Sequence, residues 1–260
     1  MAGPTTAICS TTCSACSAPS SSVEEAKIMK KTVAALMAIG LSAPVFAGGA
    51  DDPLLYKVMI DKLEIRSTDG PNPLVLEADA WVGYDLNKFW FKTDVERVDG
   101  KTEEAEVQFL YSRAIAPFWD LQVGWRRDIK PEPDRDFLAF GFKGLAPYLF
   151  EVDTGVFIGE SGQIGARLDA EYEYMFTQKL ILSPEIAMNL YSKDDAAVGI
   201  GSGLSDMELG LRLRYEVRRE FAPYIGVNWT NKFGQTADFA RDEGEDTSDV
   251  QFVAGIRAWF

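Results

Sequence analysis

Apolar and polar residues alternate along this chain over stretches longer than an ordinary soluble strand. In "QIGARLDAEYEYMFT", Arg167, Asp169 and Glu171 share one face, and the residues between them are aliphatic. The stretches "PLVLEADAWVGYD" and "MELGLRLRYEVRR" and the terminal "VQFVAGIRAWF" repeat this period of two. Because successive side chains of a strand point to opposite faces, the pattern predicts two-faced strands, several of ten or more residues.

About twelve such strands follow one another along the chain. Tight links such as "DLNK", "APFW", "GLAPY", "FTQK" and "REFAP" alternate with longer polar links such as "STDGPNP", "DIKPEPDRD" and "SKDDAAVGIGSG". Short periplasmic turns, longer outer loops and an even number of strands are typical of an outer-membrane barrel. We therefore predict an all-β fold, an antiparallel up-and-down transmembrane β-barrel. The predicted strands are 54–67, 73–85, 88–98, 103–115, 118–129, 135–144, 148–159, 163–176, 179–192, 204–219, 221–233 and 249–260.

Alternation alone also fits a soluble β-domain whose charged face meets water. The aromatic residues favour the membrane, because they gather at the tight-turn end, where a barrel carries a belt of amphipathic rings. Phe260 ends an apolar strand face, so we expect it to face lipid at the periplasmic rim. Its place resembles the terminal aromatic signal that the outer-membrane assembly machinery reads. The predicted belt consists of Phe89, Trp90, Phe118, Trp119, Tyr148, Phe221, Trp259 and Phe260.

The stretch "MKKTVAALMAIGLSAPVFAGG" has the layout of a secretory signal peptide. Lys30 and Lys31 form its basic start, an apolar core follows, and Ala47 is a small residue suited to cleavage. We therefore expect translation to start at Met29. The chain contains no run of about 18 to 20 apolar residues, so the sequence does not predict a membrane-spanning helix. The predicted organisation is an upstream extension (1–28), a signal peptide (29–47), a short linker (48–53) and a barrel (54–260).

Composition removes several classes of function. The net charge of −14 is unsuited to nucleic acid, so cations are the more natural guests. The chain has no histidine, which excludes Ser-His-Asp and Cys-His chemistry, and we expect no enzymatic activity. All three cysteines, Cys9, Cys13 and Cys16, lie in the predicted extension among serine, threonine and alanine, and we do not interpret them as a metal motif.

Several strings identify the chain as similar to the outer-membrane copper resistance protein B family. They include "EADAWVGYDLNKFWFKTD", "LYSRAIAPFWDLQVGWRRD", "GSGLSDMELGLRLRYEVRREFAPYIGV" and "VAGIRAWF", and the resemblance runs from about Leu54 to Phe260. It implies an integral outer-membrane barrel that handles or passes copper together with periplasmic copper-handling proteins. Members often carry a Met- and His-rich segment before the barrel, whereas here only "GGADDP" separates Ala47 from Leu54. The alternative is a generic small-solute porin or a structural barrel without a metal role.

The charged faces of the strands supply the candidate lumen residues. In a narrow barrel such residues pair across the lumen as a structural network, because unpaired buried charge is costly. Their acidic excess also creates a field that attracts cations, and both roles are compatible. The acidic candidates are Glu77, Asp79, Asp153, Asp169, Glu171, Glu173, Glu208 and Glu216, with Asp120 on the same kind of face. The basic candidates are Arg126, Arg167, Arg212, Arg214 and Arg257.

Without imidazole, a copper ion would have to use carboxylate or thioether ligands. Met175 shares the strand parity of Glu171 and Glu173 and is the candidate thioether, although a flexible thioether also packs well without any metal. Met188 and Met207 fall with apolar neighbours, and the first strand alternates too poorly to place Met59. We expect no tightly bound cofactor, with copper a transported or weakly bound species.

We predict that the mature protein fractionates with outer membranes and shows heat-modifiable migration on gels, because a closed barrel resists unfolding in cold detergent. Membrane fractionation and paired boiled and unboiled samples test this prediction. Recovery from the soluble periplasm without detergent would contradict it.

Overall fold

The computed structural model describes residues 52–68, 70–160 and 162–260. The predicted upstream extension (1–28) and signal peptide (29–47) lie outside the described residues, as does most of the predicted linker (48–53). Among the described residues, no helix has the length and apolar character needed to cross a membrane.

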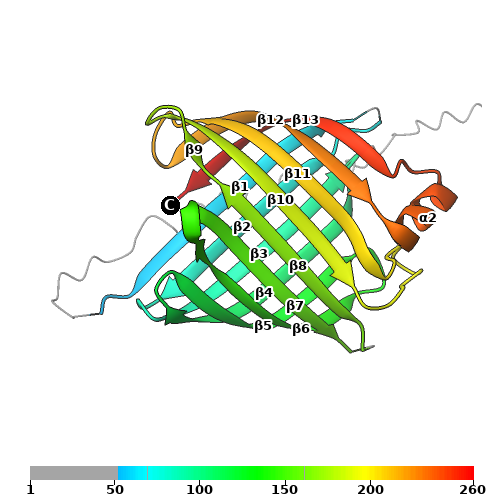
Figure 1. Cartoon of the computed structure of the whole chain (residues 1–260), viewed down its shortest axis with the longest axis horizontal. Coiled ribbons are helices and arrows are strands. Elements are labelled where there is room, and N and C mark those ends of the chain that lie inside the picture. The colour runs from blue at the N-terminus through cyan, green and yellow to red at the C-terminus, as the bar shows by residue number, and fades with distance from the viewer. Residues whose placement is uncertain (1–51, 69, 161) are drawn as a thin grey trace, which may run out of the picture. The chain divides into compact units, whose positions relative to one another are not determined.

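The chain forms one antiparallel sheet that closes on itself (Figure 1). Each strand pairs with the next along the chain, except that β8 and β9 both pair with β10, and the last strand pairs with the first from Met59 opposite Trp259 to Ser67 opposite Phe252. This closure confirms the predicted all-β, up-and-down barrel. The strands are β1 (Leu55–Ser67), β2 (Leu74–Gly83), β3 (Asn87–Val98), β4 (Lys101–Ala116), β5 (Trp119–Lys130), β6 (Arg135–Ala146), β7 (Phe150–Gly159), β8 (Ile164–Tyr172), β9 (Tyr174–Met175), β10 (Leu180–Tyr191), β11 (Gly203–Tyr215), β12 (Phe221–Lys232) and β13 (Ser248–Trp259).

These thirteen strands occupy twelve positions in the wall of the barrel. The two-residue β9 is separated from β8 by Glu173 alone, and both pair with β10, so they occupy one position in the wall. The predicted strand 163–176 therefore corresponds to β8 and β9 together.

The barrel reverses the polarity of a soluble protein. The side chain of Glu64 is fully buried and Gln122 is 2% exposed, whereas Ile225 is 64% exposed and Phe252 is 69% exposed. In a water-soluble protein this arrangement would bury charged groups and expose apolar surface to water, and both are unfavourable. A lipid surround satisfies the outer face, and a polar lumen satisfies the inner face, as in outer-membrane barrels.

The links differ in part from the predicted alternation of short and long. The loops 68–73, 131–134, 192–202 and 233–247 lie between strands at the end opposite to the tight turns. At that same end, however, only Asp99 and Gly100 join β3 to β4, with φ angles of 49° and 78°. Such positive angles at both positions are those of the two-residue hairpin turn that matches strand twist, so this outer link needs no extra length.

Three residues of the predicted aromatic belt are exposed as expected, but the prediction is wrong for Trp90. Phe89, Phe118 and Tyr148 are 64%, 74% and 87% exposed, as a lipid-facing or interfacial belt requires. Trp90 instead points into the barrel, where it packs against a buried cluster made of Leu110, Phe137, Ala139 and Phe157. The strand alternation explains this, since Trp90 shares its face with Lys88 and Lys92 rather than with Phe89.

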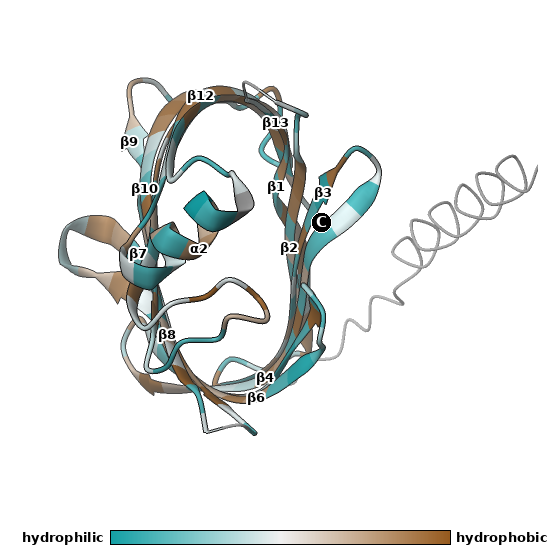
Figure 2. Cartoon of the chain, turned by 90° about the vertical axis from the view of Figure 1, so that its right-hand side faces the viewer, coloured by the Kyte–Doolittle hydropathy of each residue, from teal (hydrophilic) through white to brown (hydrophobic). Residues whose placement is uncertain are grey.

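A short helix, α2 (Gly234–Glu243), interrupts the loop between β12 and β13, where the sequence predicted only a polar link. Seen end-on, α2 lies across the ring of strands (Figure 2). The hydroxyl of Thr236 accepts a hydrogen bond from the backbone N–H of Gly201 at 2.9 Å and pairs with the hydroxyl of Ser205 at 2.9 Å. Ala237 and Ala240 are buried, so α2 is anchored over the outer mouth by polar and apolar contacts.

Phe260 completes the seam between the first and last strands. Its N–H donates to the carbonyl of Val58 at 2.8 Å, the N–H of Val58 donates back at 3.1 Å, and its side chain is 70% exposed. We predict that Phe260→Asp lowers the assembled fraction in heat-modifiability assays, because it puts a charge where the seam meets lipid. Phe118→Asp, at an exposed turn, is the control. Assembly of the Phe260 variant at wild-type levels would show that the terminal aromatic is incidental.

Candidate functional site

The barrel encloses a cavity of about 1500 Å³ that is lined by all twelve wall positions. Most of the predicted charged residues line it: Glu77, Asp79, Asp153, Asp169, Glu171, Glu208, Arg126, Arg167, Arg212, Arg214 and Arg257. Glu173 and Glu216 do not line it, but Glu173 lies 2.6 Å from Arg214 and 3.5 Å from Arg257, which do. Glu216 follows the end of β11 and lies 3.5 Å from Arg219 in the adjoining turn, at the tight-turn end of the barrel.

Glu64 on β1 is the centre of the most buried charged group. Its carboxylate accepts hydrogen bonds from Nε of Arg66 at 2.9 Å, from Nε and Nη2 of Arg212 at 3.0 Å each, and from the hydroxyl of Tyr224 at 2.9 Å. A fully buried carboxylate is tolerated only with such complete pairing. The partners come from β1, β11 and β12, which the closing of the sheet brings together.

The same group continues across the lumen. Arg212 donates through Nη1 to Glu185 on β10 at 2.6 Å. Lys62 on β1 bonds to Glu185 as well and lies 3.0 Å from Glu77 on β2. Around the wall β1 and β10 are four positions apart, so the contact between Lys62 and Glu185 is a bridge through the interior.

A second group is built around Glu106 on β4. Its carboxylate lies 2.8 Å from Arg126 on the neighbouring β5 and 2.9 Å from Arg167 on β8, four wall positions away. Arg126 also pairs with Asp128 at 2.7 Å and stacks over the ring of Phe157, 4.3 Å from its centroid. Aromatic rings thus support guanidinium groups on the inner wall, a contact that is favourable where water is partly excluded.

Two further bridges cross the barrel nearer the tight-turn end. Lys92 on β3 lies 2.6 Å from Asp153 on β7. Arg257 on β13 lies 2.9 Å from Asp61 and 3.4 Å from Glu171 on β8. The pairs Lys92–Asp153 and Arg257–Glu171 again join wall positions four apart, whereas Asp61 lies on β1, next to β13. Ion pairs therefore cross the interior at several levels along the barrel, instead of lying only along its wall.

The charged strand faces predicted only about half of this network. The missed members are Asp61, Lys62, Glu64, Arg66, Lys92, Glu106, Asp128, Lys143 and Glu185. For most of them the alternation within the predicted strands carried the signal, since Lys92 and Glu106 share faces with polar neighbours. On β1 the signal was obscured, because a register shift between Ile60 and Lys62 interrupts the alternation.

Not every carboxylate of the lumen is neutralised. Within the described residues, Asp169 and Glu104 line the cavity and form no ion pair, and the acidic side chains along the cavity outnumber the basic ones. Glu96 and Glu104 also oppose each other directly across β3 and β4. Like charges at such positions repel, so this part of the wall favours a cationic guest.

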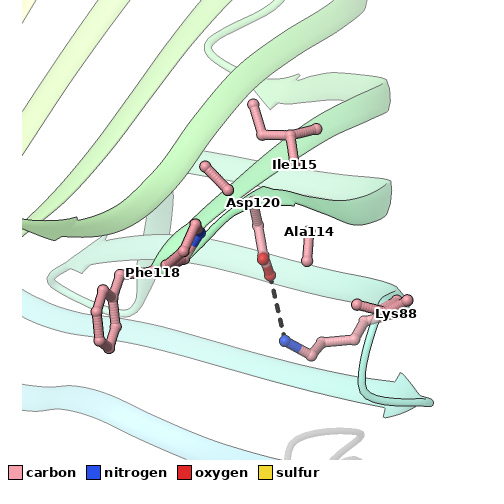
Figure 3. A pocket seen from close by; sticks show the side chains of 8 residues that line it. Lys88, Ala114, Ile115, Phe118 and Asp120 are labelled. Atoms are coloured by element: carbon pink, nitrogen blue, oxygen red, sulfur yellow. Dashed lines mark hydrogen bonds and ion pairs between the residues drawn. The ribbon is translucent and has the colours of Figure 1, made fainter.

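A smaller pocket of about 550 Å³ lies at the tight-turn end, between the β2–β3 and β4–β5 links. Leu86, Ile115 and Phe118 provide its apolar lining, and Lys88 lies 3.2 Å from Asp120 beside it (Figure 3). The pairing with Lys88 accounts for Asp120, which the sequence had placed on a charged face.

The metal ligands expected from the sequence are not gathered at one place. Met175 is 63% exposed in β9 and does not line the cavity. In the part of the chain that the structure describes, no group of three or more aspartate, glutamate, cysteine or histidine side chains has a geometry that could hold a metal ion. A tight carboxylate site is therefore absent from the described barrel.

Comparison with known proteins matches this chain to one family. The model of the family described as copper resistance protein B precursor (CopB) matches residues 54–260. Copper resistance protein B of Escherichia coli is 46% identical over 210 residues, which are 81% of this chain and 71% of that protein. The copper resistance protein B homolog of Pseudomonas syringae pv. tomato is 44% identical over 200 residues, 77% of this chain and 68% of that protein.

Solved structures share the fold at low identity. The NanC porin has a TM-score of 0.51 and 12% identity, with 78% of this chain and 99% of that chain covered. The KdgM porin has a TM-score of 0.50 and 10% identity, with the same coverage of 78% and 99%. These likenesses concern the fold alone.

The closed barrel, its apolar outer face and its charged lumen define an integral β-barrel protein of the outer membrane. Within that class, the chain belongs to the copper resistance protein B family, as the match over 54–260 shows. The resemblance noted from the strand sequences is thereby confirmed.

We predict that Glu64→Ala destabilises the folded barrel by about 3 to 5 kcal/mol, because it removes a fully buried carboxylate from two buried guanidinium groups and leaves Arg66 with Glu208 and Arg212 with Glu185. Urea unfolding in lipid vesicles, followed by tryptophan fluorescence, measures this change. Asp134→Ala removes an exposed partner of Arg127 and should cost about 0 to 1 kcal/mol. Equal losses in the two variants would contradict a bracing role for Glu64.

Proposed function

We propose that this member of the family serves copper resistance at the outer membrane by passing copper ions through its lumen or holding them there weakly. Family membership supports the link to copper, and the closed barrel supports a non-enzymatic role. The observation that carries the proposal is the acidic excess along the cavity, which attracts cations of any kind.

The ligand chemistry favours weak and transient binding. Tight copper sites use several preorganised strong ligands, and a Cu(II) centre would normally recruit imidazole, which this chain lacks. Copper is thus proposed as cargo with no tightly bound cofactor. Selectivity for it would come from periplasmic copper-handling proteins that deliver or receive the ion, while outer-membrane lipid and the assembly machinery are the other expected partners.

A generic cation porin or a purely structural barrel is the second candidate, favoured by the bridges across the lumen. Ion pairs such as Glu106 with Arg167 brace the wall whether or not an ion passes. Copper sensitivity and envelope copper content of a deletion strain separate the two functions. Complementation with the wild-type chain should restore both values, and a deletion strain with unchanged copper tolerance and content would favour the generic barrel.

We predict that neutralising Asp169, Glu171 and Glu173 together lowers cation conductance in planar bilayers more than Met175→Leu does. The change removes negative charge, takes Glu173 away from Arg214 and leaves Arg257 with Asp61, so the local field becomes more positive. The matched control neutralises Glu132, Asp134 and Asp238, three exposed carboxylates of the loops and α2. Equal effects of the two triple variants would show that net charge, not the lumen, controls passage.

Copper titration of the same purified variants tests the weak binding. We expect no submicromolar affinity in the wild-type barrel. Submicromolar binding that disappears in Met175→Leu but persists in the lumen triple variant would overturn this prediction and make Met175 a ligand.

A further inference from the structure

A bulge in β1 places a thioether on the inner wall. The pairing with β2 runs from Met59 opposite Asp79 to Ile60 opposite Ala78, and then resumes at Lys62 opposite Glu77, so Asp61 has no partner on β2. Directly opposed residues share a face. Because Asp79 faces the cavity, Met59 faces it too, and Met59, Asp61 and Asp79 all line it.

One carboxylate oxygen of Asp79, beside Met59 on the inner wall, is a hydrogen-bond acceptor without a donor among the described residues. The residue is only 7% exposed, and its Oδ1 receives no hydrogen bond from any described residue. Its Oδ2 lies 3.9 Å from Nζ of Lys143, which is closer to Asp153 at 3.4 Å. A buried carboxylate oxygen without a donor is costly, so it is a natural contact for a cation in the lumen.

We propose that Met59 and Asp79, with Asp61 beside them, form a transient contact for a monovalent soft cation, Cu⁺, in the tight-turn half of the lumen. A thioether is a soft ligand that favours Cu⁺, and a carboxylate supplies the charge that offsets lost hydration. This inference rests on the proposed function, because it names where copper as cargo touches the wall.

The other methionines of the described barrel are less suited to this contact. Met175 is exposed outside the cavity. Met188 and Met207 oppose each other, and Met188 also opposes the exposed Leu168, so strand pairing places both on the apolar face, although Met207 also borders the cavity. Met59 alone among these four stands opposite a buried lumen carboxylate.

Lys143 competes for the same carboxylate. Its ammonium group lies 5.0 Å from the ring centroid of Trp90 and is shared between Asp153 and Asp79. A guest at Asp79 therefore meets a nearby positive charge, which keeps binding weak and release fast. Removal of this charge in Lys143→Gln should strengthen cation binding at Asp79, whereas a purely structural Asp79 would show no such gain.

The test follows the methionine methyl groups by NMR. The purified protein, labelled with ¹³C at the methionine methyls and held in detergent micelles, is titrated with Ag⁺ as a redox-stable substitute for Cu⁺. We expect a saturable shift of the Met59 methyl and smaller shifts at Met175, Met188 and Met207. Asp79→Asn should weaken the apparent affinity by about tenfold, and Lys143→Gln should raise it.

Controls separate this site from folding and from the wider function. All variants are checked for heat-modifiable migration, and Met188→Leu is the matched lipid-facing substitution, which should leave the Met59 shift unchanged. A shift at Met175 without one at Met59, or an Ag⁺ response unaffected by Asp79→Asn, would overturn the proposal. If Met59 fails to respond while the deletion strain is copper sensitive, only this site is wrong. If Met59 responds while the strain tolerates copper normally, the site stands and the proposed function fails.

Discussion

The pairing of β13 with β1 is the constraint on which the rest of this molecule depends. In hydrocarbon, every backbone N–H and C=O must find its partner inside the protein, and a sheet achieves this only by closing. The seam runs from Met59 to Ser67 and is extended by the reciprocal hydrogen bonds between Val58 and Phe260. Once the sheet is closed, successive side chains of each strand point alternately outward and inward. The apolar residues then face lipid, and the residues between them are enclosed in the lumen.

Closure creates the electrostatic problem that the lumen solves. Charged side chains on the inner faces cannot reach bulk water freely, so each needs a partner, and in a twelve-position wall the partner is often across the interior. Lys62 with Glu185, Arg167 with Glu106 and Lys92 with Asp153 each span four positions of the wall. The same bridges narrow the free space, so bracing of the barrel and passage through it compete for the same side chains.

The incomplete neutralisation of the lumen connects this bracing to function. Where a carboxylate has no resident cation, as at Asp169 or Oδ1 of Asp79, a mobile cation can take the place of a lysine or arginine. An ion that exchanges between such positions never meets a complete coordination shell. Moderate attraction of the cation, spread over several positions, favours its transfer through the lumen, whereas a complete set of ligands at one position would retain it.

Much of the fold follows from the sequence alone, because the period of two is a local property of each strand. It was enough to place the strands, the lumen face of Arg212 and the exposed ring of Phe260. Which charges meet was decided by the tertiary structure. Glu64 and Arg212 are 148 positions apart in the sequence, and only the number and stagger of the strands bring them together. The bulge at Asp61 and the docking of α2 over the mouth also depend on neighbours that no single strand specifies.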